Sequence, residues 1–357
     1  MLNFTVGPVQ SSAGVRAVGA ENVPYFRTPE FSQLMHENER MTLEFTNAPR
    51  DSRVVFLTGS GTAAMEAAVM NALTSSDKAL VVNGGSFGAR FVQLLQLHEI
   101  PHTEIKLEPG CALREDDLAQ YDGQGYTTFL INACETSTGV KYDLEMVAEF
   151  CKRNGAFLIV DAISYFLAEE FDMTALDVGV MLTGSQKALA CPPGISLLTL
   201  APRALERVAT TPVKCMYLDL KDALKNGERG QTPFTPAVGT LIQIHERLAE
   251  IAAQGGAHTE VARIAGLARY FRNAIRDLPF DFATDSPCAS VTALRPQTAS
   301  AYDIFTTLKD EYEIWVCPNG GALRDTLFRV GHIGALTTDD YDVLLDALRD
   351  MRRRALI

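Results

Sequence analysis

The chain has 357 residues, of which 47% are hydrophobic, enough for one large and one smaller buried core. Its formal net charge of −12 argues against nucleic acid and anionic membrane surfaces as partners, although a local cationic pocket can still bind a small anion. The seven cysteines show no CxxC or metal-ligand spacing, and no apolar run is long enough to cross a bilayer. With no charged-then-apolar leader at the N-terminus, we expect a cytoplasmic protein with free thiols and no metal site.

The first strand of the predicted core leads into a glycine-rich turn. Residues 1–15 show no clear period, residues 30–47 show helical spacing, and residues 53–57 predict a strand. Gly59-Ser60-Gly61-Thr62 follows, and residues 63–73 predict a helix whose start suits a phosphate group. The residues alone leave open an ordinary helix cap formed by Ser60 or Thr62.

Two further strands end in turns with functional side chains. Residues 78–83 lead to Gly84-Gly85-Ser86-Phe87-Gly88, where the flanking glycines leave the aromatic face open to a flat partner, unless Phe87 is a core residue at a helix start. Residues 102–107 predict an edge strand and residues 114–120 a short helix. A buried strand at 126–132 precedes Glu135-Thr136-Ser137-Thr138-Gly139, a turn whose hydroxyls bind a ligand or cap the helix predicted at 142–153.

An aspartate and a lysine lie at the ends of the next strands. The apolar run 156–161 ends on Asp161, as expected for a parallel strand that presents an acid to a crevice. Lys187 lies between the buried strands predicted at 178–183 and 195–200, and no other charged residue occurs from Gly179 to Pro202. Desolvation there would favour the neutral, nucleophilic amine, whereas a lysine that ends a strand can instead hold its head in water. The repeated strand–helix alternation predicts an α/β fold with a mainly parallel sheet.

The remaining residues predict a mobile charged loop and a smaller α+β part. The loop is expected within 203–230, because charges and an Asn-Gly pair cluster at 218–230, and a proline-bounded turn follows at 232–236. Helices are predicted at 241–254, 260–278, 300–311 and 339–352, and strands at 290–294, 314–317 and 327–330. Arg329 lies in the last of these strands, where a cation needs a partner, either a substrate anion or an internal acid. We divide the chain into an arm (1–15), a large domain (16–255) and a small C-terminal domain (256–357).

A phosphate cradle, a strand-end acid and a buried lysine together are typical of a pyridoxal 5'-phosphate site. The chain resembles the class V, fold-type I aminotransferases, closest to the 2-aminoethylphosphonate–pyruvate and alanine–glyoxylate transaminases. The motifs that carry the resemblance occur in family order across the chain: Phe4-Thr5-Val6-Gly7-Pro8-Val9, Thr58-Gly59-Ser60-Gly61-Thr62, Asn83-Gly84-Gly85-Ser86-Phe87-Gly88, Glu135-Thr136-Ser137-Thr138-Gly139, Val160-Asp161-Ala162, Gly184-Ser185-Gln186-Lys187-Ala188, Thr232-Pro233-Phe234-Thr235-Pro236 and Phe328-Arg329-Val330-Gly331.

The resemblance implies a seven-stranded-type sheet with helices on both faces, a smaller α+β domain, and a role for each matching residue. Lys187 would form the Schiff base and carry the proton, and Asp161 would hold the pyridine nitrogen protonated. The other cofactor contacts implied are Ser60, Gly61 and Thr62 at the phosphate, Phe87 and Ile163 on opposite ring faces, Thr136 near the phenolic oxygen, and Gln186. Thr235, with Thr232 as second candidate, would reach the partner's phosphate across a homodimer interface, and Arg329 would bind the substrate carboxylate.

The implied function is a ping-pong transaminase that transfers an amino group from a small-molecule donor to a 2-oxo acid. Residues 232–236 and 325–331 look more like the phosphonate transaminases, so we lean to 2-aminoethylphosphonate as donor and pyruvate as acceptor, with Arg27 and Arg229 as candidates for the distal anion. The alternatives are an alanine or serine–glyoxylate aminotransferase, and a lyase or cysteine desulfurase that would use Cys317. A non-catalytic sensor on the same scaffold is disfavoured because the lysine is intact.

Overall fold

The centre of the protein is a seven-stranded sheet whose strands all lie between residues 53 and 200. The computed structural model describes residues 1–357. In spatial order the strands are β2 (Arg53–Thr58), β10 (Ile195–Leu200), β9 (Val178–Gly184), β8 (Phe157–Asp161), β5 (Thr128–Asn132), β3 (Ala79–Asn83) and β4 (His102–Lys106). The predicted strands at these positions are all present, and β4 lies at the edge as expected.

The sheet is mainly parallel, and its one reversed strand follows the lysine. β9, β8, β5, β3 and β4 pair in parallel, whereas β10 runs antiparallel to both β2 and β9. β9 and β10 are therefore antiparallel neighbours, and residues 185–194 connect the carboxyl end of β9 to the start of β10. The predicted α/β fold with a mostly parallel sheet is confirmed.

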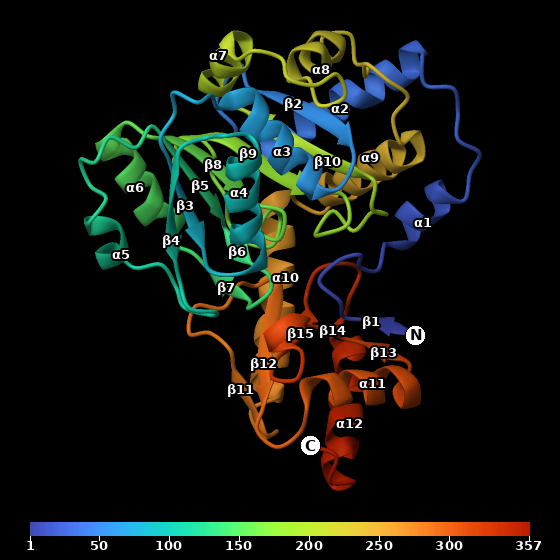
Figure 1. The fold of residues 1–357 in the computed structure, drawn as a ribbon. Coiled ribbons are helices and arrows are strands. Elements are labelled where there is room, and N and C mark those ends of the chain that lie inside the picture. Colours follow the sequence, from blue (N-terminus) through green and yellow to red (C-terminus); the bar gives the residue numbers. More distant parts are fainter.

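Helices cover both faces of this sheet because the strand side chains alternate between two apolar clusters. One face packs on α3 (Gly61–Ala72), α4 (Ser86–Leu97), α7 (Pro202–Thr210) and α8 (Leu220–Gly227). The other face packs on α1 (Ala13–Gly19), α2 (Pro29–Phe45), α6 (Leu144–Asn154) and α9 (Val238–Ala253). Figure 1 shows α3 and α4 in front of the strands. The short helix α5 (Glu115–Ala119) and the small pair β6 (Cys134–Glu135) and β7 (Val140–Lys141) complete this part.

The prediction of a mobile loop within residues 203–230 is wrong. Helix α7 and helix α8 occupy most of this segment, and the Asn-Gly pair forms the last turn of α8. Asp219 caps α8 by accepting a hydrogen bond from the backbone of Lys221, while Leu220 and Ala223 bury the inner face. The charges therefore lie on the outer face of an amphipathic helix.

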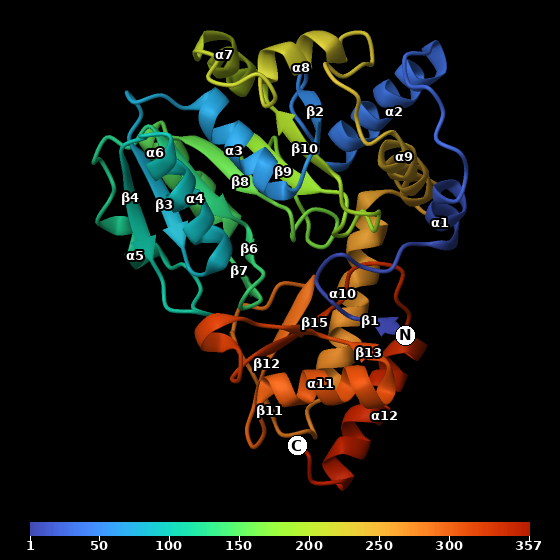
Figure 2. The same cartoon turned by 45° about the vertical axis from the view of Figure 1, so that its right-hand side comes forward.

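The C-terminal third has its own four-stranded sheet and its own apolar cluster. The strand order is β11 (Phe280–Phe282), β12 (Val291–Pro296), β15 (Phe328–Gly331) and β14 (Cys317–Pro318), all antiparallel. The helices are α10 (Ala257–Ala274), α11 (Ala301–Tyr312) and α12 (Thr338–Arg353), with a 3₁₀ turn at Gly321–Leu323. The strand predicted at 314–317 is split, because β13 (Ile314–Trp315) leaves this sheet to pair elsewhere. In both views α10 runs from the large sheet into this lower part (Figures 1 and 2).

The N-terminal segment packs on this C-terminal part before it reaches the large sheet. β1 (Leu2–Asn3) pairs in parallel with β13, and Phe4 belongs to the C-terminal apolar cluster. Gly331 at the end of β15 donates a backbone hydrogen bond to Phe4 at 2.6 Å. Figure 2 shows this blue segment beside the red C-terminal elements, with α1 above it. The domain boundaries at 15 and 255 stay a prediction.

A buried ion network joins α9 to α10. Glu260 accepts hydrogen bonds from Arg247 at 2.6 Å and from two nitrogens of Arg263 at 2.7 and 2.8 Å. Glu260 and Arg247 are both buried. Arg263 also donates to the backbone carbonyls of Gly334 and Leu336, so one carboxylate holds two arginines that bridge three segments.

Replacing Glu260 by glutamine should lower the free energy of unfolding by about 3 kcal/mol, since Arg263 loses its buried counter-charge and Arg247 keeps only its longer pair with Glu250 at 3.4 Å. The matched control is Glu44→Gln, which breaks the Arg40–Glu44 pair, whose side chains are 65% and 64% exposed, and should cost under about 1 kcal/mol. Guanidinium unfolding of both variants measures the difference. Equal destabilisation by the two substitutions would contradict this account of the network.

Candidate active site

Lys187 is buried at the connection between β9 and β10. Only 7% of its surface is exposed, so the alternative of a solvated lysine is wrong. Its Nζ donates a hydrogen bond to the carbonyl of Val6 at 2.6 Å. Burial lowers the pKa of Lys187 to about 8, with Arg329 acting in the same direction and Cys317 and Asp161 opposing it. Roughly a tenth of the amine is therefore neutral at pH 7, far more than for an ordinary lysine.

The N-terminal segment lies directly against the lysine side chain. A Cβ on Gly7 would come within 2.8 Å of the Lys187 Cδ, and Gly7 has φ +125°, a conformation that favours glycine. Gly7 thus lets the backbone cross the lysine stem while the preceding Val6 carbonyl binds the amine. Gly7 and Pro8 therefore lie at the site, and the segment also contacts the strand that carries Arg329.

Asp161 ends β8, as predicted, and its carboxylate is buried. Burial raises the pKa of Asp161 to about 6, although the backbone N–H of Ile163 donates to it at 2.9 Å and so opposes the shift. Glu135 raises this pKa further, whereas Lys187 and Arg90 lower it. An acid with this pKa suits a protonated ring nitrogen that would pair with it.

The start of α3 is open to an anion. Ser60 is the N-cap residue, but its side chain makes no capping hydrogen bond, so the alternative of an ordinary side-chain cap does not apply to Ser60. A Cβ on Gly61 would lie 2.3 Å from the Ile163 side chain, which shows how closely the turn packs on the segment after Asp161. The Thr62 hydroxyl accepts a hydrogen bond from Arg90 at 3.0 Å. A helix N-terminus beside a guanidinium and two hydroxyls fits a phosphate group.

Phe87 lies near the start of α4 and is only partly buried, which argues against a core phenylalanine. The guanidinium of Arg90 lies 5.2 Å from its ring centroid. Arg90 therefore joins the Phe87 ring to the Thr62 hydroxyl. Arg90 was not predicted from the sequence, although its position three residues after Phe87 on a helix could have indicated a shared face.

Thr136 is buried and its hydroxyl lies 2.6 Å from that of Ser164. Thr136 therefore does not cap α6, whose cap is Asp143. Ser164 follows Asp161 by three residues and was missed, since nothing in the sequence pairs the two hydroxyls. Ile163 is buried in the same segment, and Gln186, next to Lys187, is partly buried.

Arg329 has no acidic partner, so the alternative of an internal ion pair is wrong. Its two terminal nitrogens donate to the carbonyls of Thr136 at 3.0 Å and Pro318 at 2.8 Å, while its Nε is buried without a partner. Cys317 stands opposite Arg329 in the register of β14 and β15. A buried guanidinium without a counter-charge is chemically suited to bind an anionic substrate group.

The two arginines predicted to bind the distal anionic group of the substrate form hydrogen bonds within the protein instead. Arg27 donates to the carbonyls of Thr232 and Pro233, and Arg229 is exposed and bonded to Asn226. The hydroxyl of Thr232 is used within its own turn, where it donates to the Phe234 carbonyl at 2.7 Å. By contrast, Thr235 is exposed and makes no side-chain hydrogen bond.

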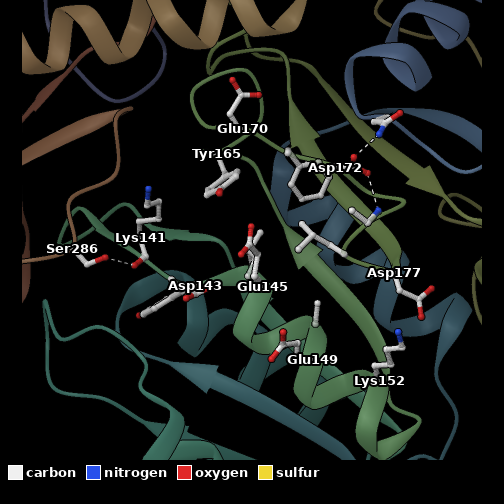
Figure 3. A pocket seen from close by; sticks show the side chains of 17 residues that line it. Lys141, Asp143, Glu145, Glu149, Lys152, Tyr165, Glu170, Asp172, Asp177 and Ser286 are labelled. Carbon is white, nitrogen blue, oxygen red and sulfur yellow. Dashed lines mark hydrogen bonds between the residues drawn. The ribbon is translucent and has the colours of Figure 1, made fainter.

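A surface hollow of about 970 Å³ lies away from Lys187, beside α6. Figure 3 shows the carboxylates that line it together with two lysines. They are Asp143, Glu145, Glu149, Glu170, Asp172 and Asp177. Six carboxylates against two lysines would repel a phosphate or an anionic substrate, so we assign the chemistry to the Lys187 site.

No group of three or more His, Cys, Asp or Glu side chains is arranged to hold a metal ion, and no helix is both long and apolar enough to cross a membrane. The residues present do fit pyridoxal 5'-phosphate. The open start of α3 suits its phosphate, the buried amine of Lys187 its aldehyde, and the carboxyl of Asp161 its ring nitrogen.

The sequence belongs to the class V aminotransferase family, whose family model matches residues 21–322. The chain is 32% identical to a protein named soluble hydrogenase 42 kDa subunit from Anabaena cylindrica, covering 89% of this chain and 84% of the relative. It is 25% identical to a 2-aminoethylphosphonate–pyruvate transaminase of Bacillus cytotoxicus, covering 98% and 97%. An alanine–glyoxylate aminotransferase structure from Nostoc sp. superposes with a TM-score of 0.92 at 25% identity, covering 99% and 95% of the two chains. The predicted family, fold type, enzyme class and cofactor are thereby confirmed.

Because Lys187 is buried, we expect it to lower the free energy of unfolding of the cofactor-free protein by an amount that depends on pH. The pKa of Lys187 is about 8 when folded and 10.5 in the reference state, so the unfolded chain binds more protons between these values and stability rises with pH across that window. Below pH 8 the amine is charged in both the folded and the unfolded state, so its burial lowers the free energy of unfolding by the full amount. At pH 7, the free energy of unfolding of Lys187→Met should therefore be about 3 kcal/mol higher than that of the wild type.

Denaturant unfolding at pH 7, 9 and 10.5 checks this expectation, and the advantage of Lys187→Met should shrink as the pH rises. Lys106→Met, at a side chain that is 80% exposed, is the control and should show no such trend. A Lys187→Met advantage that is absent at pH 7 would contradict the desolvation of the amine.

Proposed function

We propose that the protein is a ping-pong transaminase that uses Lys187 to move an amino group from a small anionic amine or amino acid to a 2-oxo acid. The observation that carries the proposal is the buried amine of Lys187 placed among Asp161, Arg329 and the open start of α3. When bound, pyridoxal 5'-phosphate supplies the aldehyde that reacts with amines and the ring that withdraws electrons from them.

In this proposal Lys187 carries the proton between the donor carbon and the cofactor, first as base and then as acid. A pKa of about 8 suits both roles near neutral pH, because neither form of the amine is rare. The Val6 carbonyl, which accepts from Nζ, orients the amine, and the N-terminal segment limits the access of water.

Arg329 is our candidate for the substrate anion. Its position in a buried strand and its unpartnered Nε support this role, as does the absence of any acid within ion-pair distance. Because Arg27 and Arg229 are occupied outside this cluster, we infer that one guanidinium serves both half-reactions. A carboxylate and a phosphonate are both anions that a guanidinium can grip in this way.

For the donor we retain 2-aminoethylphosphonate, with alanine, serine and aspartate as competing donors and pyruvate or glyoxylate as acceptor. Support for the phosphonate comes from the full-length similarity to the Bacillus cytotoxicus transaminase, and support for alanine from the Nostoc structure. The desulfurase alternative has less support, because Cys317 lies in strand β14 and pairs with β15 instead of lying on a long loop.

Mixing the cofactor-loaded protein with single donors tests the function. We expect one donor to convert the visible band of the aldehyde form into that of the amine form, and a 2-oxo acid to reverse the change. Lys187→Ala should lose turnover by at least about a thousandfold, while Lys106→Ala should keep it. Release of sulfide from cysteine, or full turnover by Lys187→Ala, would refute the proposal.

Arg329→Lys separates charge from geometry at the anion site. Lysine keeps the positive charge but loses the planar fork, so we expect KM for the 2-oxo acid to rise roughly tenfold or more. Arg324→Lys is the matched control, since Arg324 is exposed on the same hairpin, where it pairs with Asp325 and lies over the Tyr302 ring. Steady-state kinetics give the comparison, and an unchanged KM in Arg329→Lys would remove Arg329 from the site.

We also propose a homodimer in which Thr235 completes the partner's phosphate site. Exposed apolar side chains gather near the 232–236 turn, including Met216 and Tyr217, and Tyr217 stacks on Phe234 at 5.4 Å. Sedimentation should give about twice the chain mass of 38.9 kDa. Met216→Asp should lower the mass toward the monomer, whereas Leu97→Asp, at an exposed leucine on α4, should not. A monomeric wild type would contradict the proposal.

A further inference from the structure

Glu135 is a fully buried carboxylate without a basic partner. It ends β6, has 0% exposed surface and forms no ion pair. One oxygen accepts from the backbone N–H groups of Phe87 at 3.1 Å and Gly88 at 3.2 Å, and from the side-chain amide of Asn132 at 3.0 Å. The other accepts from the backbone and the hydroxyl of Ser137 at 3.2 and 2.5 Å. Every group that contacts the carboxylate donates a hydrogen bond to it, so both oxygens of Glu135 must act as acceptors.

The carboxylate takes the place of a cap on helix α4. The N-cap residue of that helix is Gly85, which has no side chain to offer. Glu135 reaches from another element to the second and third residues of α4, where a negative charge also interacts favourably with the helix dipole. A Cβ on Gly85 would lie 2.6 Å from the Glu135 carboxyl carbon, so the helix start and the glutamate are in close contact.

The same side chain holds two other parts of the site. Ser137 belongs to the turn that contains Thr136, whose carbonyl accepts from Arg329. Asn132 stands opposite Asp161 in the register of β5 and β8. Glu135 therefore connects the start of α4, which lies 48 residues earlier at Phe87, to the Thr136 turn and the end of the strand next to Asp161, both of which are close to Glu135 in sequence.

We propose that Glu135 is a positioning residue that fixes Phe87 relative to Thr136 and Asp161 and so sets the orientation of the cofactor ring. The proposal rests on the proposed function, because the roles of Phe87 and Thr136 toward the cofactor belong to it. Glu135 acts through these residues and needs no contact of its own with cofactor or substrate.

Glutamine is the informative substitution. Glu135→Gln keeps the size of the side chain but replaces one acceptor by an NH₂ group, which must then face either the α4 amides or Ser137. The buried N–H groups on the side that the NH₂ group faces, either at Gly88 or at Ser137, would then lose their hydrogen-bond acceptor. Asp143→Asn is the matched control, because Asp143 is also a carboxylate that caps a helix, at Met146 of α6.

The test uses the purified protein with pyridoxal 5'-phosphate and reads binding and ring orientation instead of turnover. For each variant we would measure the dissociation constant of the cofactor and the visible circular dichroism per bound cofactor. We expect Glu135→Gln to weaken binding roughly tenfold and to reduce the dichroism by about half or more. Asp143→Asn should match the wild type in both.

A double-mutant cycle distinguishes positioning from general destabilisation. If Glu135 acts through the aromatic ring, Glu135→Gln should change the dissociation constant by less than about threefold in a Phe87→Leu background. Should Glu135→Gln fail to fold, Ser137→Ala removes one hydrogen bond to the Glu135 carboxylate and is read in the same way, with a smaller expected change in binding and in dichroism.

Binding and dichroism within twofold of the wild type in the folded variant, or equal effects in both backgrounds, would overturn the positioning role alone. A wild-type protein that binds no pyridoxal 5'-phosphate would instead overturn the proposed function, and this proposal with it.

Discussion

The removal of the Lys187 amine from water is the constraint on which the rest of the site depends. The amine lies on a connection between two fully buried strands, in a stretch without any other charge. Its one hydrogen-bond partner, the Val6 carbonyl, comes from the N-terminal segment. Because that segment is hydrogen-bonded to β15 of the four-stranded sheet, the environment of the lysine depends on both the seven-stranded and the four-stranded sheet.

Charged side chains of both signs surround the lysine. Asp161 and Glu135 lie buried at strand ends, whereas Arg90 and Arg329 are the cations of the cluster. An acidic protein can therefore present a positive site to an anionic substrate, while the carboxylate-lined groove beside α6 stays unsuited to one.

Much of the fold and the central site residues could be predicted from the sequence because their signals are local. Uniform apolar runs marked the buried strands, and the isolated charge of Lys187 marked the site. The segment at 203–230 was misread because the inner face of α8 contributes only two buried residues, Leu220 and Ala223, under a charged outer face. Arg90, Ser164 and the contacts of Glu135 with α4 could not be predicted in this way, since their partners lie 28 to 48 residues away and are brought together only by the fold.

A direct titration of the Lys187 amine tests the central claim. The cofactor-free protein would be acetylated briefly at a series of pH values, and mass spectrometry would give the extent of modification at Lys187 relative to an unfolded reference. The structure predicts a midpoint near pH 8, the value at which the pKa of Lys187 lies. A midpoint at or above the ordinary lysine value of about 10.4 would show that the amine is solvated and would contradict this account.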